Sequence, residues 1–231
     1  MTLFLCTVWP SLGHALLTTL WMTLLSGLLA TAVGGVIAWL QLEPARPWTG
    51  FARVYLAVIR NTPLLIQLYL WYRGLPAVGV LLPPEVCGVL ALGCYTGAYM
   101  AEVFRSALAS LPREQRDSAL SLGLSLPRTY LGILLPQCLP VLVPPLTNVW
   151  IAVLKNSSLL MLITVSELFQ FVYKGAVDGF QPLPYFLLGL LLYLVLSVGF
   201  SFALQALGRW LTPRALRHAE VRRLQTVGWG A

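Results

Sequence analysis

The chain has 231 residues, of which 58% are hydrophobic and only 10% charged, and its mean hydropathy is +0.79. Soluble domains carry about 25% charged residues, so this composition excludes an ordinary soluble enzyme and indicates a membrane protein. The formal net charge of +7 comes from basic residues spread over short connections between apolar runs. This spread favours membrane orientation signals over a nucleic-acid-binding surface.

Apolar segments of spanning length recur along the chain, and the first begins near the N-terminus. No charged residue precedes Glu43, so residues 13 to 41 are predicted to form a retained first helix and not a cleaved signal peptide. Further spanning helices are predicted at 52 to 72, 85 to 108, 136 to 154 and 184 to 208. The predicted fold is an all-α integral membrane protein with about five transmembrane helices in one domain, residues 1 to 231.

Arginine is concentrated in three hydrophilic regions that fall on one side of the membrane if the number of spans is odd. These residues are Arg46, Arg53, Arg105, Arg113, Arg116, Arg128, Arg209, Arg214, Arg217, Arg222 and Arg223. The other side would hold the N-terminus with Arg73, Lys155 and Lys174. The excess of arginine predicts that the N-terminus lies outside and that the basic tail, residues 209 to 231, lies in the cytoplasm.

Two segments depart from regular spanning helices. A sixth crossing at residues 156 to 173 would place an arginine-rich region outside, so this apolar segment is predicted to be a re-entrant or surface helix packed in the bundle. The fourth predicted helix contains Pro136, Pro140, Pro144 and Pro145. Because proline removes a backbone donor, this helix is predicted to be kinked or locally unwound. It could line a pathway, or be a structural helix whose missing bonds are replaced by neighbours.

Residues for catalysis or metal binding are not recognisable in the pattern. The four cysteines have no close paired spacing, and His14 and His218 lie at opposite ends of the chain, so neither a metal site nor a disulfide framework is predicted. No GxxxxGK[ST] phosphate loop occurs, so nucleotide chemistry would belong to another polypeptide. An intramembrane enzyme is disfavoured because no catalytic set recurs on facing helices.

The connection between the third and fourth predicted helices, residues 109 to 135, is long and patterned. Residues 113 to 122 place charges together with Leu and Ala at helical spacing. Gly123 follows where a helix would end in a left-handed cap, and Ser125 can cap a second helix. The prediction is a short helix, a sharp turn and another short helix at the inner membrane surface.

The spacing in this loop resembles that of the cytoplasmic loop of bacterial ABC-importer permeases. That family pattern is Glu-Ala-Ala, three residues, Gly, nine residues, Ile, one residue and Leu-Pro. Here the corresponding residues are Asp117, Ser118, Ala119, Gly123, Ile133, Leu135 and Pro136. Residues 60 to 67, 98 to 105 and 154 to 159 resemble segments of the polar amino-acid branch, and the resemblance covers about residues 13 to 210.

The resemblance implies the following assembly in the bacterial inner membrane. Two permeases, identical or similar, form the translocation path, two cytoplasmic ATPases use ATP and Mg, and a periplasmic or extracellular amino-acid-binding protein delivers substrate. This chain would bind no cofactor and no nucleic acid, and it would contact the lipid bilayer. The seven loop residues named above would couple it to the ATPases.

Polar residues at apolar segments are candidates for the substrate path: Arg60, Thr62, Glu102, Asn156, Ser157 and Glu167. Arg60 could hold the carboxylate of a zwitterion, and Glu102 or Glu167 its ammonium. The structural alternative, which the positions near helix ends favour, is that Arg60 and Glu102 pair with each other or with head groups. The chief alternative function is a stand-alone secondary transporter or channel, which would need ion-coupling carboxylates deep in its helices.

Overall fold

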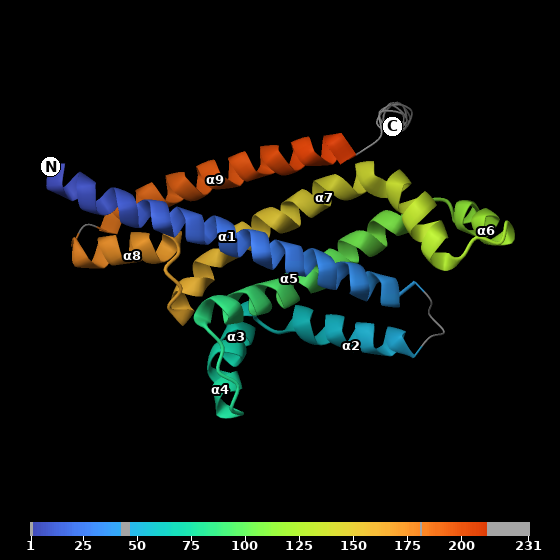
Figure 1. Cartoon of the computed structure of the whole chain (residues 1–231), viewed down its shortest axis with the longest axis horizontal. Helices are drawn as coiled ribbons and strands as arrows, with labels where there is room; N and C mark the ends of the chain where they lie inside the picture. The colour runs from blue at the N-terminus through green and yellow to red at the C-terminus, as the bar shows by residue number, and fades with distance from the viewer. Residues whose placement is uncertain (1, 43–46, 181, 212–231) are drawn as a thin grey trace, which may run out of the picture. The chain divides into compact units, whose positions relative to one another are not determined.

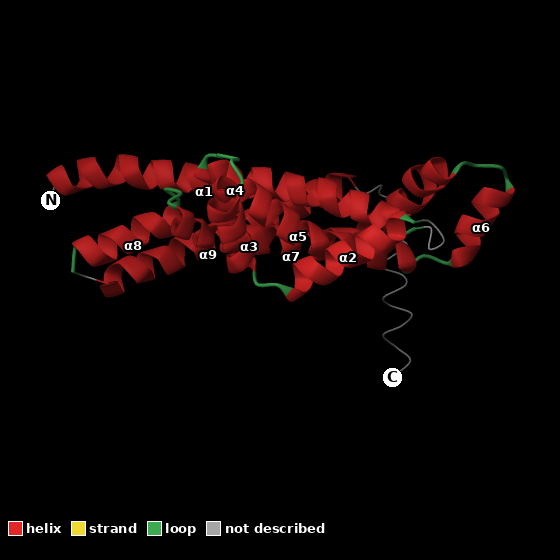
Figure 2. Ribbon diagram, turned by 90° about the horizontal axis from the view of Figure 1, so that it is seen from below, coloured by secondary structure: helices red, strands yellow, loops and turns green. Residues whose placement is uncertain are grey.

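The computed structural model describes residues 2–42, 47–180 and 182–211, and over these ranges every regular element is a helix (Figure 2). The predicted basic tail beyond residue 211, with Arg214, Arg217, Arg222 and Arg223, lies outside the described residues, as does Arg46. The chain divides into two compact units. One contains the described residues up to 101 and those from 149 to 199, and the other contains residues 102–148 and the described residues from 200 to 211.

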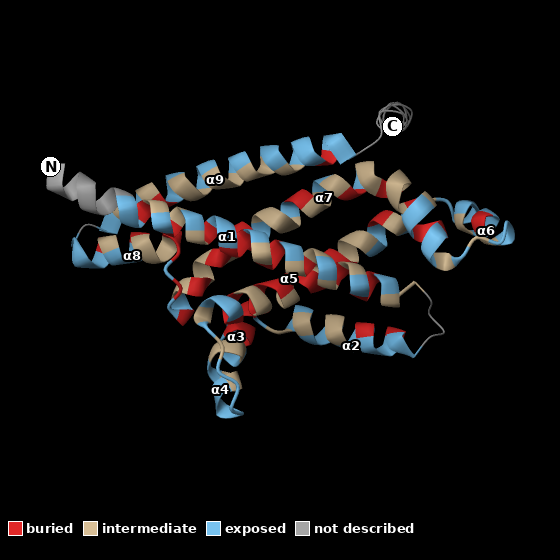
Figure 3. Ribbon diagram, in the orientation of Figure 1, coloured by how far each residue is buried: buried red, intermediate tan, exposed pale blue. Residues whose placement is uncertain are grey.

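Four stretches of the described chain are long and apolar enough to cross a membrane: Pro10–Leu40, Pro84–Ala109, Arg128–Ile163 and Pro182–Leu211. The first lies within helix α1 (Thr2–Leu40), the others contain α5 (Pro84–Ala109), α7 (Leu135–Asn156) and α9 (Pro182–Leu211), and the third stretch also includes the helical residues on either side of α7. The spanning helices predicted at 13 to 41, 85 to 108, 136 to 154 and 184 to 208 are therefore confirmed. Exposed residues recur along α9, whereas most residues of α5 are buried or intermediate in exposure (Figure 3).

The prediction of one continuous helix at 52 to 72 is wrong. α2 (Trp48–Asn61) ends at Thr62, whose extended backbone (φ −115°, ψ 141°) precedes Pro63. Proline disfavours the helical conformation of the residue before it, which explains the break. α3 (Leu64–Tyr69), η1 (Leu70–Gly74) and α4 (Leu75–Ala77) follow and turn away from the direction of α2 (Figure 1). The 14 residues of α2 extend about 21 Å, less than a bilayer core of about 30 Å.

The polar side chains at this break satisfy its free carbonyl groups. Gln67, which is buried, donates from Nε2 to Ile59 O at 3.0 Å and to Thr62 Oγ1 at 2.6 Å. The Thr62 hydroxyl in turn donates to Val58 O at 2.9 Å. Buried backbone groups need such partners where a helix is interrupted. Thr62 and Gln67 thus stabilise the break itself.

Close packing in the first unit depends on glycines of α5 and α1. A Cβ added at Gly93 would overlap Leu29, and one added at Gly97 would overlap Val33. These two glycines are four residues apart on one face of α5, the G-x-x-x-G spacing that lets membrane helices approach closely. The aliphatic side chains of α1 therefore fill the space that the missing Cβ atoms leave.

The predicted second short helix of the loop is not a separate element. The chain is helical without interruption from residue 126 into α7, first as the π-helix η2 (Arg128–Leu134). Leu135 N donates to Tyr130 O, five residues back, directly before Pro136. The wider turn accommodates a proline that cannot donate to the preceding turn. Beyond this local widening, α7 stays helical through its other prolines.

Residues 156 to 173 form a short helix, a reversal and the start of a second helix. The 3-10 helix η3 (Ser157–Ile163) ends at Thr164, whose φ of 71° is left-handed, and α8 (Leu168–Asp178) follows. With 11 residues, about 16 Å, α8 is too short to cross a bilayer, and it packs against α1 (Figure 1). Among the described residues η3 only prolongs the candidate span Arg128–Ile163 and α8 is not a candidate span, which agrees with the prediction that this segment adds no further crossing.

Candidate coupling loop and substrate-path residues

Helix α6 (Arg113–Ser121) lies in the connection between α5 and η2, and its C-terminus has a defined cap (Figure 1). Gly123 has φ +78°. Gly123 N donates to Leu120 O at 2.9 Å, and Leu124 N donates to Ala119 O at 3.2 Å. These two bonds form a Schellman motif, in which a left-handed residue closes the helix. The left-handed cap predicted at Gly123 is therefore confirmed.

The two faces of α6 differ in exposure. Ala119 is buried, and α6 packs against η2, where Thr129 and Tyr130 are also buried. On the other side Asp117 and Ser118 are exposed, and the Leu122 side chain is 82% exposed. The other three predicted coupling residues, Ile133, Leu135 and Pro136, are intermediate in exposure on η2 and at the start of α7. The loop therefore presents an exposed surface with two large apolar side chains, Leu122 after α6 and Leu131 on η2.

The helix ends on either side of α6 are packed together. Ala107 of α5 forms a buried cluster with Cys138 and Leu142 of α7, and Val103, Phe104 and Leu139 pack around it. α6 is thus attached at both ends to helices that share one apolar core. A displacement of α6 would have to move that core or be resisted by it.

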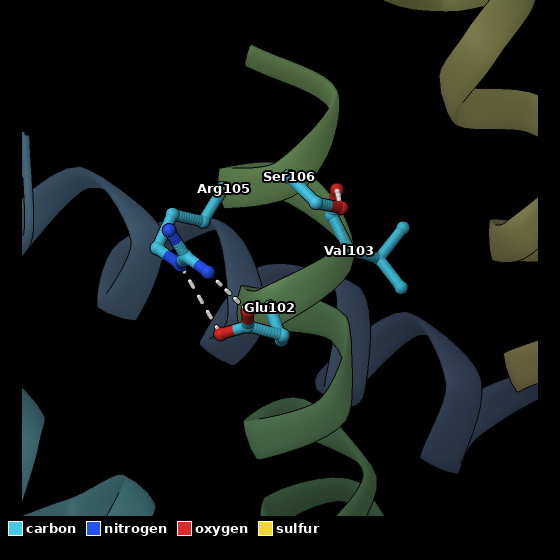
Figure 4. Close-up of polar contacts among 4 residues, drawn as sticks. All are labelled: Glu102, Val103, Arg105 and Ser106. Atoms are coloured by element: carbon cyan, nitrogen blue, oxygen red, sulfur yellow. Dashed lines mark hydrogen bonds and ion pairs between the residues drawn. The ribbon is translucent and has the colours of Figure 1, made fainter. Parts of the chain in front are cut away.

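Glu102 forms an ion pair with Arg105 one helical turn further along α5 (Figure 4). The Arg105 Nε donates to Glu102 Oε2 at 3.2 Å, and a second bond joins the same two groups. On the opposite side of the helix Val103 joins the apolar cluster. Exposed pairs of this kind stabilise a helix by less than about 1 kcal/mol. Arg60, for its part, places its guanidinium 5.8 Å from the centre of the Tyr99 ring.

Glu167 is fully buried and caps α8. Its carboxylate accepts hydrogen bonds from Phe169 N at 2.8 Å and Gln170 N at 2.7 Å, and Tyr193 Oη donates to it at 2.8 Å. Leu168 N donates to Thr19 Oγ1 of α1 at 2.9 Å, so the first backbone donors of α8 are satisfied. Burial raises the pKa of Glu167 to about 7, although these hydrogen bonds lower it in part.

The structure brings two of the six predicted path residues together. Tyr193 hydrogen-bonds to Glu167 and interacts with Ser157, which is buried and donates to Leu154 O at 2.8 Å. Asn156 precedes Ser157, whereas Thr62 belongs to the break after α2. Sequence reasoning missed Thr19 and Tyr193. The signal for Thr19 was a hydroxyl inside a long uncharged helix, where polar groups need a partner.

Four stretches of the described chain that are long and apolar enough to cross a bilayer, with an exposed capped helix between two of them, define a multi-pass membrane protein. Residues 27–215 match the family described as binding-protein-dependent transport system inner membrane component, and the chain belongs to this family. It is therefore a multi-pass inner-membrane component of an importer, and permeases of this family have no ATPase activity of their own.

The relatives agree with this assignment. The chain is 32% identical over 212 residues to the glutamine transport system permease GlnP of Escherichia coli K12. This match covers 87% of this chain and 94% of the relative. It is 33% identical over 162 residues to the L-cystine transport system permease TcyB of Bacillus subtilis, with 70% and 69% covered. A crystal structure of an amino acid ABC transporter with histidines matches with a TM-score of 0.78 and 28% identity, over 90% of this chain and 97% of that one.

Proposed function

We propose that this chain is the permease subunit of an ATP-driven amino-acid importer and that the segment 113–136 couples it to the ATPases. Amino-acid permeases among its relatives support the substrate class. The path would form where this chain meets a second permease, identical or similar. Two cytoplasmic ATPase subunits would bind ATP and Mg, and an external binding protein would deliver the amino acid.

The observation that carries the coupling proposal is the construction of α6. Its C-terminus is fixed by the Gly123 cap, its buried face rests on η2, and both of its connections lead to packed helices. A short helix fixed in this way transmits a displacement as a rigid body. The exposed Asp117, Ser118 and Leu122 supply polar contacts and one apolar anchor for an ATPase groove.

The proposed orientation places the N-terminus outside and the C-terminus in the cytoplasm. It needs a fifth crossing, which we assign to α2 together with the segment from Leu64 to Ala77. Gln67 and Thr62 satisfy the backbone at the break, which supports an interrupted helix at membrane depth. The arginines of the α6 loop then lie in the cytoplasm.

Reporter fusions test this orientation. A reporter active only in the cytoplasm is expected to be active when fused after Ala231 or inserted between residues 113 and 128, and silent when fused at Ala77. The reason is the concentration of arginine on the proposed inner side. Activity at Ala77 together with silence in the loop would invert the orientation and remove α6 from reach of the ATPases.

Reconstitution tests the function. The permease, co-expressed with the ATPase and the binding protein with which it assembles, is expected to accumulate at least one amino acid in liposomes, and accumulation should require ATP on the cytoplasmic side. Uptake driven by an ion gradient without ATP would instead support the secondary-transporter alternative. ATP-dependent uptake of a solute that is not an amino acid would overturn the proposed substrate class.

A further inference from the structure

A pocket of about 280 Å³ lies between the N-terminal part of α1 and α8, which packs against it (Figure 1). Both helices belong to the first unit. The volume is just below the range of about 300–1,000 Å³ that whole drug-sized ligands occupy, so the pocket has room for a single polar head group. Its lining residues are Ser11, His14, Ala15, Ser166, Glu167, Gln170, Phe171 and Lys174.

The pocket has two ends, because α8 runs antiparallel to α1 along it. Leu168 N at the start of α8 donates to Thr19 Oγ1 at 2.9 Å, and further along α8 Lys174 lines the pocket together with Ser11 of α1. One end therefore lies at Glu167, the residue before α8, and the other at Lys174. The two residues are about 10 Å apart along the helix axis.

The two ends differ in charge and exposure. At one end the Glu167 carboxylate is buried and already accepts three hydrogen bonds from within the chain. At the other end Lys174 and His14 are exposed and supply an ammonium group and an imidazole N–H. The hydroxyl groups of Ser11 and Ser166 are also in the lining. Donors that converge from two helices suit a group with several acceptor oxygens, such as a phosphate.

The Lys174 end lies where lipid head groups would be. The apolar stretch Pro10–Leu40 has 31 residues, about 46 Å, whereas the hydrocarbon core of a bilayer is about 30 Å thick. Ser11 and His14 belong to the first turns of this stretch, so they fall in the interfacial region at its end. Phosphate groups of phospholipids occupy the same depth.

An exposed apolar stripe continues from this pocket along α1 toward the centre of the bilayer. Leu17, Trp21, Leu24 and Leu28 follow His14 at intervals of three and four residues, which places them on one helix face. Their exposed fractions are 68%, 60%, 41% and 54%. A donor-lined pocket beside this α1 stripe matches the two parts of a phospholipid, the phosphate and the acyl chains. A soluble phosphate, or an acidic side chain of a docked protein, would use the pocket but not the stripe.

We propose that this pocket binds the phosphate of an anionic phospholipid, with Lys174 and His14 on the phosphate oxygens and an acyl chain along the α1 stripe. Ser11 and Ser166 supply further donors. Phosphatidylglycerol fits this lining, since its head group adds hydroxyl groups that pair with serine hydroxyls. The lipid would join α8 to α1 at the end opposite Glu167. This site goes beyond the proposed function, because it does not depend on which solute is transported.

Native mass spectrometry of the purified permease–ATPase complex in detergent tests the site, with phosphatidylglycerol and phosphatidylcholine as the added lipids. Phosphatidylglycerol is expected to bind roughly five-fold tighter, since each basic group near an anionic lipid contributes about that factor. In Lys174→Ala this preference should be lost, and Lys174→Arg should keep it. Lys155→Ala, which removes an exposed lysine outside the lining, should bind phosphatidylglycerol as the unmodified complex does.

Two further measurements distinguish the lipid from other occupants. Inorganic phosphate at millimolar concentration should leave phosphatidylglycerol bound, and complete displacement would assign the pocket to soluble phosphate. Leu17→Ser should weaken phosphatidylglycerol binding, since it interrupts the α1 stripe; unchanged affinity would show that no acyl chain lies there. Displacement of the lipid by the purified binding protein, absent in Lys174→Ala, would assign the pocket to an acidic surface of that protein.

The preference between the two lipids decides the proposal. Equal affinity for phosphatidylglycerol and phosphatidylcholine, or a preference retained in Lys174→Ala, would overturn it. If Lys174→Ala fails to assemble, His14→Ala on α1 should lower phosphatidylglycerol affinity roughly three-fold through the lost hydrogen bond, and unchanged affinity would again overturn the proposal.

Discussion

Gly123→Val should abolish most of the ATP hydrolysis that external substrate stimulates, while the amount of inserted chain stays unchanged. Gly123 has φ +78°, a conformation that costs a residue with a Cβ about 1–2 kcal/mol and a β-branched one more. A Cβ at this position would meet no atom within 4 Å in the chain. The expected effect therefore comes from the backbone: the turn changes, the cap opens, and α6 loses its direction.

Two variants serve as controls for Gly123→Val. Gly123→Asn should remain near the unmodified activity, since asparagine tolerates the left-handed region. Gly79 has φ +86° and equally open surroundings, so Gly79→Val has a comparable backbone cost outside the α6 loop. Co-purification with the ATPase and substrate-stimulated hydrolysis in liposomes are the measurements. Gly79→Val is expected to keep its substrate-stimulated ATP hydrolysis. If Gly123→Val keeps as much of this hydrolysis as Gly79→Val, α6 does not transmit the motion.

The α6 loop could be predicted from sequence because its determinants are local. A charged helical repeat followed by glycine specifies a short helix with a left-handed end, and the structure has both. The second half of the loop was predicted less well. Leu135 bonds to Tyr130 in a π-turn, so the chain passes into α7 without a separate second helix. The π-turn directly precedes Pro136, and η2 packs against α6. The spacing of apolar and charged residues does not predict either the wider turn or this packing.

The break after α2 was missed although its signal is in the sequence. The run of apolar residues from 52 to 72 favoured one helix by length, whereas Thr62 before Pro63 favours extended backbone. Local steric exclusion prevailed over hydrophobic length. Gly93 and Gly97 likewise show a readable spacing whose partners, Leu29 and Val33, only the tertiary structure identifies.

The surroundings of Glu167 could not be predicted by spacing. Tyr193 and Thr19 come from α9 and α1, far along the chain in both directions. The sequence identified Glu167 as a carboxylate that needs partners, and the structure supplies two backbone donors and the Tyr193 hydroxyl. Tertiary packing alone decides which hydroxyl meets the carboxylate.

Glu167→Ala should strongly reduce the amount of folded permease. The change removes the acceptor for Phe169 N and Gln170 N and leaves the Tyr193 hydroxyl without its partner in a buried site. Each buried donor left unsatisfied costs about 1–3 kcal/mol. Monodisperse protein recovered in detergent, measured by size exclusion, is expected to fall severely. Full recovery of a monodisperse Glu167→Ala complex would show that α8 does not need this cap.

Glu167→Gln should instead change how stability depends on pH. Because burial raises the pKa of Glu167 from 4.5 to about 7, the folded protein holds this proton more tightly than the unfolded chain. The free energy of unfolding should therefore fall as pH rises from 4.5 to about 7 and level off above that. At about 1.4 kcal/mol per pKa unit, the total loss is roughly 3 kcal/mol. Glutamine stays neutral and keeps one acceptor oxygen, so the variant should lack this loss. Thermal unfolding of the detergent-solubilised complex between pH 5 and 8 measures the difference. The unmodified protein and Glu167→Gln share all other titrating groups, so any difference in how their Tm depends on pH comes from Glu167. Parallel curves of Tm against pH would show that Glu167 stays ionised or accessible to water.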